Sequence, residues 1–123
     1  MSLLFVDIDR FKQINDALGH DAGDRVLQYV ARFLKRNIRE ADFVFRWGGD
    51  EFLVLISCTE DEAIRRARDL QHAFATAPHA AHLPPGVALS VGCVEVPPDI
   101  DDMMPLIQAA DERMYANKKR RRA

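Results

Sequence analysis

Residues 46–52 are Arg46-Trp47-Gly48-Gly49-Asp50-Glu51-Phe52, and the pattern of this stretch predicts the centre of the fold. Two adjacent glycines stand directly before two adjacent carboxylates, and apolar runs lie on either side, at 43–45 and 52–56. Glycine accepts positive φ and lets a backbone or a ligand approach closely, so the pattern predicts a tight β-hairpin with Asp50 and Glu51 at its tip. Paired carboxylates at a turn are typical of a divalent-metal site, although a solvated acidic turn has the same composition.

The composition is that of one globular domain. The chain has 123 residues, of which 48% are hydrophobic and 29% are charged, and this length is sufficient to bury a core. It has no run of about 18 apolar residues, so we expect no membrane span in this fragment and a cytoplasmic location. Cys58 and Cys93 lack metal-ligand spacing and are expected to be reduced core residues. Within the basic run 118–122, residues 119–121 are expected to be solvated, and we expect no nucleic-acid partner.

Hydrophobic periodicity predicts the element order β-α-α-β-β-α-β-α. The strands are expected at 2–8, 41–46, 51–58 and 87–96, and the helices at 10–18, 21–39, from 59 or 60 to 75, and from 101 or 102 through 114. The hairpin in the middle excludes a purely parallel, doubly wound sheet. We therefore predict a single α+β domain with a mixed central β-sheet, flanked by helices on one or both faces.

Two acidic residues are predicted to meet at one edge of this sheet. Asp7 comes near the end of the first strand and Asp50 lies at the hairpin tip, so neighbouring strands would bring the two carboxylates together. Such a pair, supplemented by substrate phosphates and water, is the ligand set that Mg²⁺ prefers when it binds a nucleoside triphosphate. Lys118 and Arg122 are candidate cations for those phosphates. Asp9 is expected to cap the helix that follows it.

Five ordered motifs extend this interpretation. They are Asp-Ile-Asp-Arg-Phe-Lys-Gln-Ile-Asn-Asp at 7–16, Gly19-His20-x-x-Gly23-Asp24, the stretch 46–52, Leu89-Ser90-Val91-Gly92, and Ala110-Asp111-x-x-Met114-Tyr115-x-x-Lys118. Together they resemble the GGDEF domain family, from residue 2 to about residue 122. That family comprises diguanylate cyclases, which condense two GTP molecules into cyclic di-GMP and release two pyrophosphates. The resemblance implies a nucleotidyl-cyclase-like fold with a ferredoxin-like palm.

The resemblance also implies a metal centre and a proton acceptor. Mg²⁺ or Mn²⁺ would be coordinated by Asp7, the Ile8 carbonyl and Asp50, with Glu51 beside them. Asp50 would also accept the proton of the 3′-hydroxyl group as this group attacks the α-phosphorus of the other GTP. Asp50 and Glu51 are therefore the expected catalytic residues.

A nucleotide site is implied in the same way. Asn15 and Asp24 would hold guanine, because an amide paired with an acceptor-only carboxylate suits the hydrogen-bonding edge of guanine and not that of adenine. Without the other motifs, an exposed helix face would explain Asn15, and the helix dipole would explain Asp24. His20 would lie near the same nucleotide. The phosphates would be contacted by the backbone around Phe11 and Lys12, at the space left by Gly49, and by Lys118 and Arg122.

A second ligand site is indicated one strand upstream of the hairpin. Arg39-Glu40-Ala41-Asp42 resembles the Arg-x-x-Asp inhibitory site at which many family members bind cyclic di-GMP. Arginine can contact phosphate or guanine in a bidentate manner, and aspartate accepts hydrogen bonds from guanine N–H groups. The alternative is an arginine at the end of a helix that pairs with a nearby aspartate. Arg65, Arg66 and Arg68 are candidates for a second face of this site.

The chain also departs from the family pattern. The upstream Asp-x-Leu-Thr-Gly-Leu-x-Asn-Arg-Arg segment and the final strand are missing, so we expect an N-terminally truncated GGDEF domain, 1–123. The family's Lys-x-x-Gly-Arg-Asn becomes Lys118-Lys119-Arg120-Arg121-Arg122, without the glycine and the asparagine. Catalysis in the family needs a homodimer, and we expect a sensory or receiver domain in the parent protein, which would be cytoplasmic or tethered to the inner membrane. The isolated fragment is expected to be weakly active or inactive.

Two other functions fit parts of the sequence. The first is a catalytically silent GGDEF module that binds GTP or cyclic di-GMP as a signalling receptor. The intact hairpin glycines and carboxylates favour the cyclase over this receptor. The second is another nucleotidyl cyclase or a polymerase-like enzyme, against which the pair Asn15 and Asp24 argues. His79 and His82 are expected to lie in a solvated loop and not to bind metal, because no third ligand is nearby.

Overall fold

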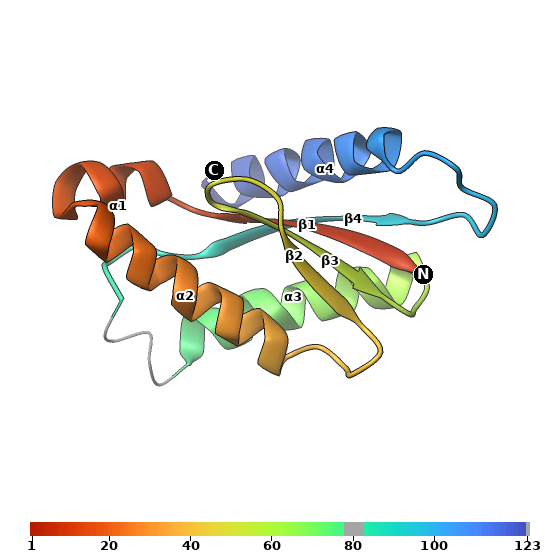
Figure 1. Cartoon of the computed structure of the whole chain (residues 1–123), viewed down its shortest axis with the longest axis horizontal. Helices are drawn as coiled ribbons and strands as arrows, with labels where there is room; N and C mark the ends of the chain where they lie inside the picture. The colour runs from red at the N-terminus through yellow and green to blue at the C-terminus, as the bar shows by residue number, and fades with distance from the viewer. Residues whose placement is uncertain (78–82, 123) are drawn as a thin grey trace.

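The computed structural model describes residues 1–77 and 83–122, and the predicted order of elements is confirmed (Figure 1). The strands are β1 (Ser2–Ile8), β2 (Phe43–Arg46), β3 (Glu51–Ile56) and β4 (Leu89–Glu95). The helices are α1 (Phe11–Leu18), α2 (His20–Arg36), α3 (Glu60–Thr76) and α4 (Met104–Arg122). None of the helices in these residues combines the length and the apolar character that crossing a bilayer requires. His79 and His82 lie outside the described residues, and Cys58 and Cys93 are both free.

The sheet has the strand order β2-β3-β1-β4, and every pair of neighbours in it is antiparallel. The prediction of a mixed sheet is therefore wrong, although the α+β class and the central hairpin are confirmed. The reason lies in the two helical crossovers, from β1 to β2 and from β3 to β4. Each crossover joins strands that run in the same direction, but each passes over one strand of the sheet, so no two parallel strands become neighbours.

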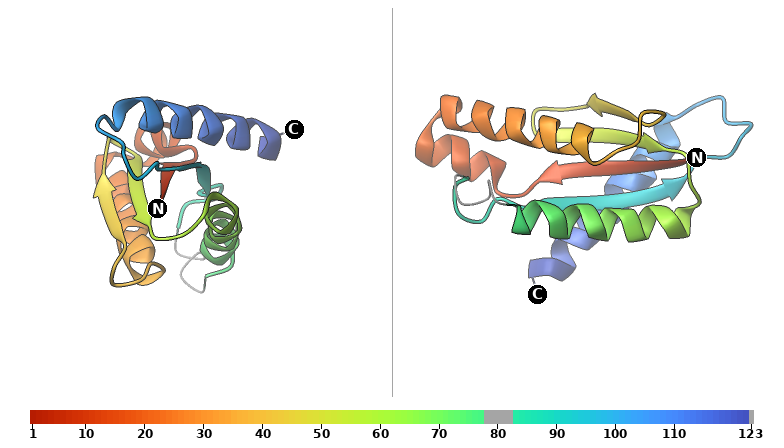
Figure 2. Two further views of the ribbon diagram at one scale, coloured as in Figure 1. Left: turned by 90° about the vertical axis from the view of Figure 1, so that its right-hand side faces the viewer. Right: turned by 90° about the horizontal axis from the view of Figure 1, so that it is seen from below.

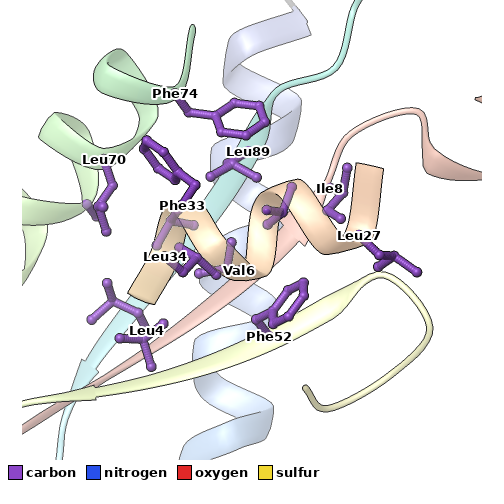
Figure 3. Packing of buried hydrophobic residues seen from close by; sticks show 14 of the residues in the cluster. Leu4, Val6, Ile8, Leu27, Phe33, Leu34, Phe52, Leu70, Phe74 and Leu89 are labelled. Carbon is purple, nitrogen blue, oxygen red and sulfur yellow. The ribbon is translucent and has the colours of Figure 1, made fainter. Parts of the chain in front are cut away.

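Helices cover both faces of the sheet (Figure 2). Alternate residues of β1 pack into the two layers. Leu4, Val6 and Ile8 face the layer formed by α2 and α3, whereas Leu3 and Phe5 face α4. Figure 3 shows the first layer, in which the rings of Phe33 and Phe74 pack edge to face with their centroids 5.2 Å apart. The site described below is therefore carried by a strand that is buried on both faces and paired on both edges.

Two glycines fix how closely other groups approach the sheet. A Cβ atom on Gly92 of β4 would collide with the backbone of α4 at Ala110 and Met114, so only glycine lets this helix lie against the strand. At the hairpin, a Cβ atom on Gly48 would collide with the side-chain carboxylate of Glu51. Gly92 thereby sets the position of α4, and Gly48 leaves room for Glu51.

The hairpin tip does not use positive φ. Among the described residues, positive φ occurs at Arg10 (63°), Gly19 (90°) and Gly86 (85°). The tip closes instead through the backbone N–H groups of Trp47 and Gly48, which both donate to the Glu51 carbonyl at 2.8 and 3.3 Å. Neither hairpin glycine therefore serves a left-handed turn, and it is Gly48 that the fold needs for space.

Candidate functional site

The end of β1 meets the hairpin tip at one edge of the sheet. Asp7 stands opposite Glu51 of β3 on one side and opposite Ser90 of β4 on the other. The next backbone N–H group, that of Ile8, donates to the Asp50 carbonyl at 3.1 Å. The structure therefore brings Asp7, Ile8, Asp50 and Glu51 together, although more than forty positions of the sequence separate the first pair from the second.

The surroundings of the carboxylates at this edge disfavour their negatively charged forms. Burial, followed by the nearby Asp50 carboxylate, raises the pKa of Asp7 from 3.8 to about 7, against a lowering effect of Lys118. Burial also raises the pKa of Glu51, with further contributions from Asp50 and Asp111. Clustered acids whose pKa values are raised by one another gain stability when a cation neutralises them.

These residues fit a hard divalent cation that is shared with a substrate. Asp7 and Asp50 offer carboxylate oxygens, and Ile8 offers a backbone carbonyl at the end of the strand. Within residues 1–77 and 83–122, no group of three or more His, Cys, Asp or Glu side chains is arranged to enclose a metal ion. The donor set is therefore of the sparse, oxygen-only kind that Mg²⁺ completes with phosphate and water, and not a closed structural metal site.

Lys118 reaches the same place from α4. Its Nζ atom lies 3.1 Å from Oδ2 of Asp7 and 3.9 Å from Oδ1 of Asp9, and its side chain is largely buried. The close contact of α4 with Gly92 places this helix where a lysine can reach the end of β1. The side chain of Arg122, at the end of α4, lies outside the described part of the structure.

A buried acceptor stands where the two N-terminal helices meet. Oδ1 of Asn15 is buried and has no hydrogen-bond partner within the described residues. It lies directly over Gly23, where any Cβ atom would collide with it. An unpaired buried acceptor is costly, and the N–H groups of a bound base would satisfy it. Asp24 follows Gly23 in α2, and His20 begins that helix; both are exposed.

The first turn of α1 follows directly on the carboxylates. Phe11 and Lys12 begin this helix after Arg10, whose φ of 63° turns the chain sharply at the end of β1. No side chain caps the helix, so the prediction that Asp9 caps it is wrong. Asp9 instead accepts a hydrogen bond from Oγ of Ser90 at 2.7 Å. The first backbone N–H groups of α1, at 11 and 12, are therefore left without a side-chain cap.

The side chain of Arg46 donates hydrogen bonds to two carbonyl groups of the hairpin tip. Its Nε atom donates to the Gly48 carbonyl at 3.2 Å, and its Nη2 atom donates to the Gly49 carbonyl at 2.9 Å. A Cβ atom on Gly49 would meet nothing within 4 Å, so this residue faces open space. The sequence interpretation missed the role of Arg46, although its place in the hairpin motif was the available signal.

The Asp42 carboxylate accepts hydrogen bonds from other residues of the chain. The donors are the backbone N–H groups of Arg39 at 2.9 Å and Ser57 at 3.2 Å, and Nη2 of Arg66 at 3.3 Å. Burial alone would raise the pKa of Asp42, but these hydrogen bonds lower it below its usual value. Of the three arginines considered on α3, Arg66 therefore contacts Asp42, while the side chain of Arg39 is exposed.

The comparisons with known proteins agree on one family. A family model described as "Diguanylate cyclase, GGDEF domain" matches residues 1–123. The chain is 36% identical over 127 residues to diguanylate cyclase DosC of Escherichia coli strain K12, a match that covers 99% of this chain and 27% of DosC. It is 38% identical over 128 residues to diguanylate cyclase TpbB of Pseudomonas aeruginosa strain PAO1, which covers 99% of this chain and 29% of TpbB. The chain thus spans less than a third of these relatives.

Solved structures share the fold. The GGDEF domain of YfiN, also called TpbB, from Pseudomonas aeruginosa superposes with a TM-score of 0.83 at 36% identity, covering 97% of this chain and 76% of that one. The GGDEF domain of DgcB from Caulobacter crescentus, solved in complex with c-di-GMP, superposes with a TM-score of 0.82 at 27% identity, covering 96% of this chain and 71% of that one.

Proposed function

The chain belongs to the GGDEF domain family of diguanylate cyclases, and from this membership we propose that it supplies the catalytic site of such an enzyme, which joins two GTP molecules into cyclic di-GMP and releases two pyrophosphates. The observation that carries the proposal is the meeting of Asp7 with the Asp50 tip at the end of β1, within reach of Lys118. This arrangement combines anionic oxygens for a metal with a cation for phosphate.

Asp7, Asp50 and the Ile8 carbonyl would hold Mg²⁺ or Mn²⁺. When bound, the metal neutralises charge on the triphosphate and makes the 3′-hydroxyl group easier to deprotonate. Asp50 accepts that proton. Glu51, whose side chain lies against Gly48, supplies a second carboxylate at the tip. Arg46 fixes the carbonyls of the tip, and Gly49 leaves room for a phosphate to approach.

Guanine binds between α1 and α2. The unpaired Oδ1 of Asn15 accepts a guanine N–H group, and the carboxylate of Asp24 accepts the neighbouring one. His20 lies at the start of α2, beside this base. Adenine lacks these paired donors, so the buried acceptor would stay unsatisfied with ATP, and the site selects GTP. The N–H groups of Phe11 and Lys12, together with Lys118, bind the β- and γ-phosphates.

Catalysis needs two copies of the chain. One site of this kind holds one GTP, and the 3′-hydroxyl group of each nucleotide must reach the α-phosphorus of the other, so two sites face each other in a homodimer. A sensory or receiver domain of the parent protein would control that encounter by raising the effective concentration of the pair. The isolated chain is therefore slow when dilute.

Cyclic di-GMP acts back on the enzyme at Arg39 and Asp42. The exposed guanidinium of Arg39 is free to contact a phosphate or the guanine edge. The Asp42 carboxylate already accepts a hydrogen bond from Arg66, so it must exchange this donor for a guanine N–H group when the product binds.

The test uses the chain alone over a range of concentrations and the chain fused to a dimerising coiled coil. Each is incubated with GTP and Mg²⁺, and cyclic di-GMP is measured by chromatography. We expect product from the fusion, little from the dilute chain, and none from Asp50→Ala. Asp61→Ala, which removes an exposed carboxylate on α3, is the matched control. A fusion that binds GTP but yields no product would favour the receptor function, and equal product from Asp50→Ala would overturn the role of Asp50.

A further inference from the structure

Asp9 is a buried carboxylate to which the proposed chemistry gives no role. It is only 9% exposed, and Ser90, which donates to it at 2.7 Å, is fully buried. Its backbone N–H group donates to the Ala88 carbonyl at 2.8 Å. Two contacts with β4 and the segment before it thus hold Asp9 in one orientation. A buried charge is expensive unless it is paired, so a cation beside Asp9 indicates what this carboxylate does.

Lys118 is such a cation. Its ammonium group lies between two carboxylates, 3.1 Å from Asp7 and 3.9 Å from Asp9. Lys118 would share the Asp7 carboxylate with any metal ion bound there, because both are cations that draw on the same charge. Lysine is a point charge on a flexible stem with high rotamer entropy, so a second anion beside it restricts where its ammonium group lies.

We propose that Asp9, oriented by Ser90, is the positioning residue that holds Lys118 against the triphosphate. The proposal rests on the proposed function, in which Lys118 binds the β- and γ-phosphates. We call the chain of contacts from Ser90 through Asp9 to Lys118 the relay. It joins three parts of the fold, since Asp9 follows β1, Ser90 belongs to β4 and Lys118 belongs to α4. With its ammonium group anchored in advance, Lys118 loses less conformational entropy when the nucleotide arrives.

The test is a double-mutant cycle that measures nucleotide affinity and not turnover. Calorimetry records the dissociation constants of the α,β-methylene analogue of GTP with Mg²⁺ and of GMP, which lacks the outer phosphates. Asp9→Asn keeps an acceptor for Ser90 but removes the charge. We expect it to weaken binding of the triphosphate about tenfold, as loss of a charge-assisted contact does, and to leave GMP within about twofold. Lys118→Met should have the same selective effect, and the double variant should be no worse than Lys118→Met alone.

The outcomes separate this proposal from the function on which it rests. If Lys118→Met loses triphosphate affinity while Asp9→Asn does not, the relay is wrong and the phosphate contact stands. If the two losses add in the double variant, or if GMP weakens equally, Asp9 does not act through Lys118. If Lys118→Met changes nothing, or the unsubstituted chain binds neither nucleotide, the phosphate site of the proposed function fails, and the relay fails with it.

Two further variants keep the test decisive. Asp61→Asn removes an exposed carboxylate from the far end of α3 and should leave both affinities unchanged. Circular dichroism checks folding, and if Asp9→Asn does not fold, Ser90→Ala takes its place. Ser90→Ala retains the Asp9 charge but releases its orientation, so we expect a loss of about threefold for the triphosphate alone. Unchanged triphosphate affinity in a folded Ser90→Ala variant would then overturn the relay.

Discussion

The Lys118 ammonium group lies 3.1 Å from the Asp7 carboxylate, so in the metal-free protein a lysine partly neutralises the acid that is proposed to bind metal. This neutralisation is incomplete, because burial and Asp50 still raise the pKa of Asp7 to about 7.

Asp7 should make the metal-free protein less stable as the pH rises. Its folded pKa of about 7 exceeds the ordinary value of 3.8, so its stabilising contribution is complete below pH 3.8 and is lost as the pH rises to 7. Asp7→Asn should therefore raise the melting temperature at pH 8 by about 4 °C without metal, and by much less at pH 5. Thermal unfolding with EDTA measures this, and a lower melting temperature for the variant at pH 8 would contradict it.

Asn15 should contribute to ligand binding and not to stability. Its Oδ1 atom has no partner among the described residues, so removing it deprives the free protein of no hydrogen bond. We expect Asn15→Ala to change the stability by less than about 1 kcal/mol but to weaken GTP binding at least tenfold, with ATP binding unchanged. Denaturant titration and calorimetry measure the two effects. A large loss of stability with unchanged selectivity would show that Asn15 is a structural residue.

Asp42 should stabilise the fold in a way that acid removes. Three hydrogen bonds lower its pKa, so its contribution is present above the ordinary value of 3.8 and is lost as the pH falls through the lower, folded value. We expect Asp42→Asn to cost about 2 kcal/mol at pH 7 and less below pH 4. Urea titrations at both pH values measure this, with the exposed Asp69→Asn as a control. An effect that does not depend on pH would exclude the role of the charge.

Substitution by alanine should affect stability strongly at one glycine and hardly at another. A Cβ atom on Gly92 would collide with the backbone of α4, and Gly92→Ala should cost about 3 kcal/mol or prevent folding. Gly49 faces open space, so Gly49→Ala should leave the stability within about 0.5 kcal/mol while weakening binding of the triphosphate. Chemical denaturation and nucleotide titration distinguish the two. Equal stability losses would show that Gly49 also serves the fold.

The sequence was sufficient to predict those features of the fold and the site that depend on neighbouring residues. Periodicity located the elements, and the hairpin motif located the carboxylates, because both depend on neighbouring residues. The sheet was predicted incorrectly as mixed, since no local pattern tells whether a crossover passes over a strand. The role of Asp9 was also missed, because an aspartate before a helix is typical of a cap, and its partner Ser90 lies 81 residues away. Among the three arginines on α3, only packing selects Arg66 as the partner of Asp42.

Strand β1 is paired with an antiparallel neighbour on each side, so the part of the site on β1 opens less readily than the part on α1. The backbone amides around Asp7 can exchange with solvent only if the ladders to β3 and β4 break, which amounts to unfolding the domain. Helix α1, which packs chiefly against α2, can open locally at much lower free energy. In the proposed enzyme, a nucleotide would therefore enter and leave by movement of α1, while the acidic groups keep their geometry through successive turnovers.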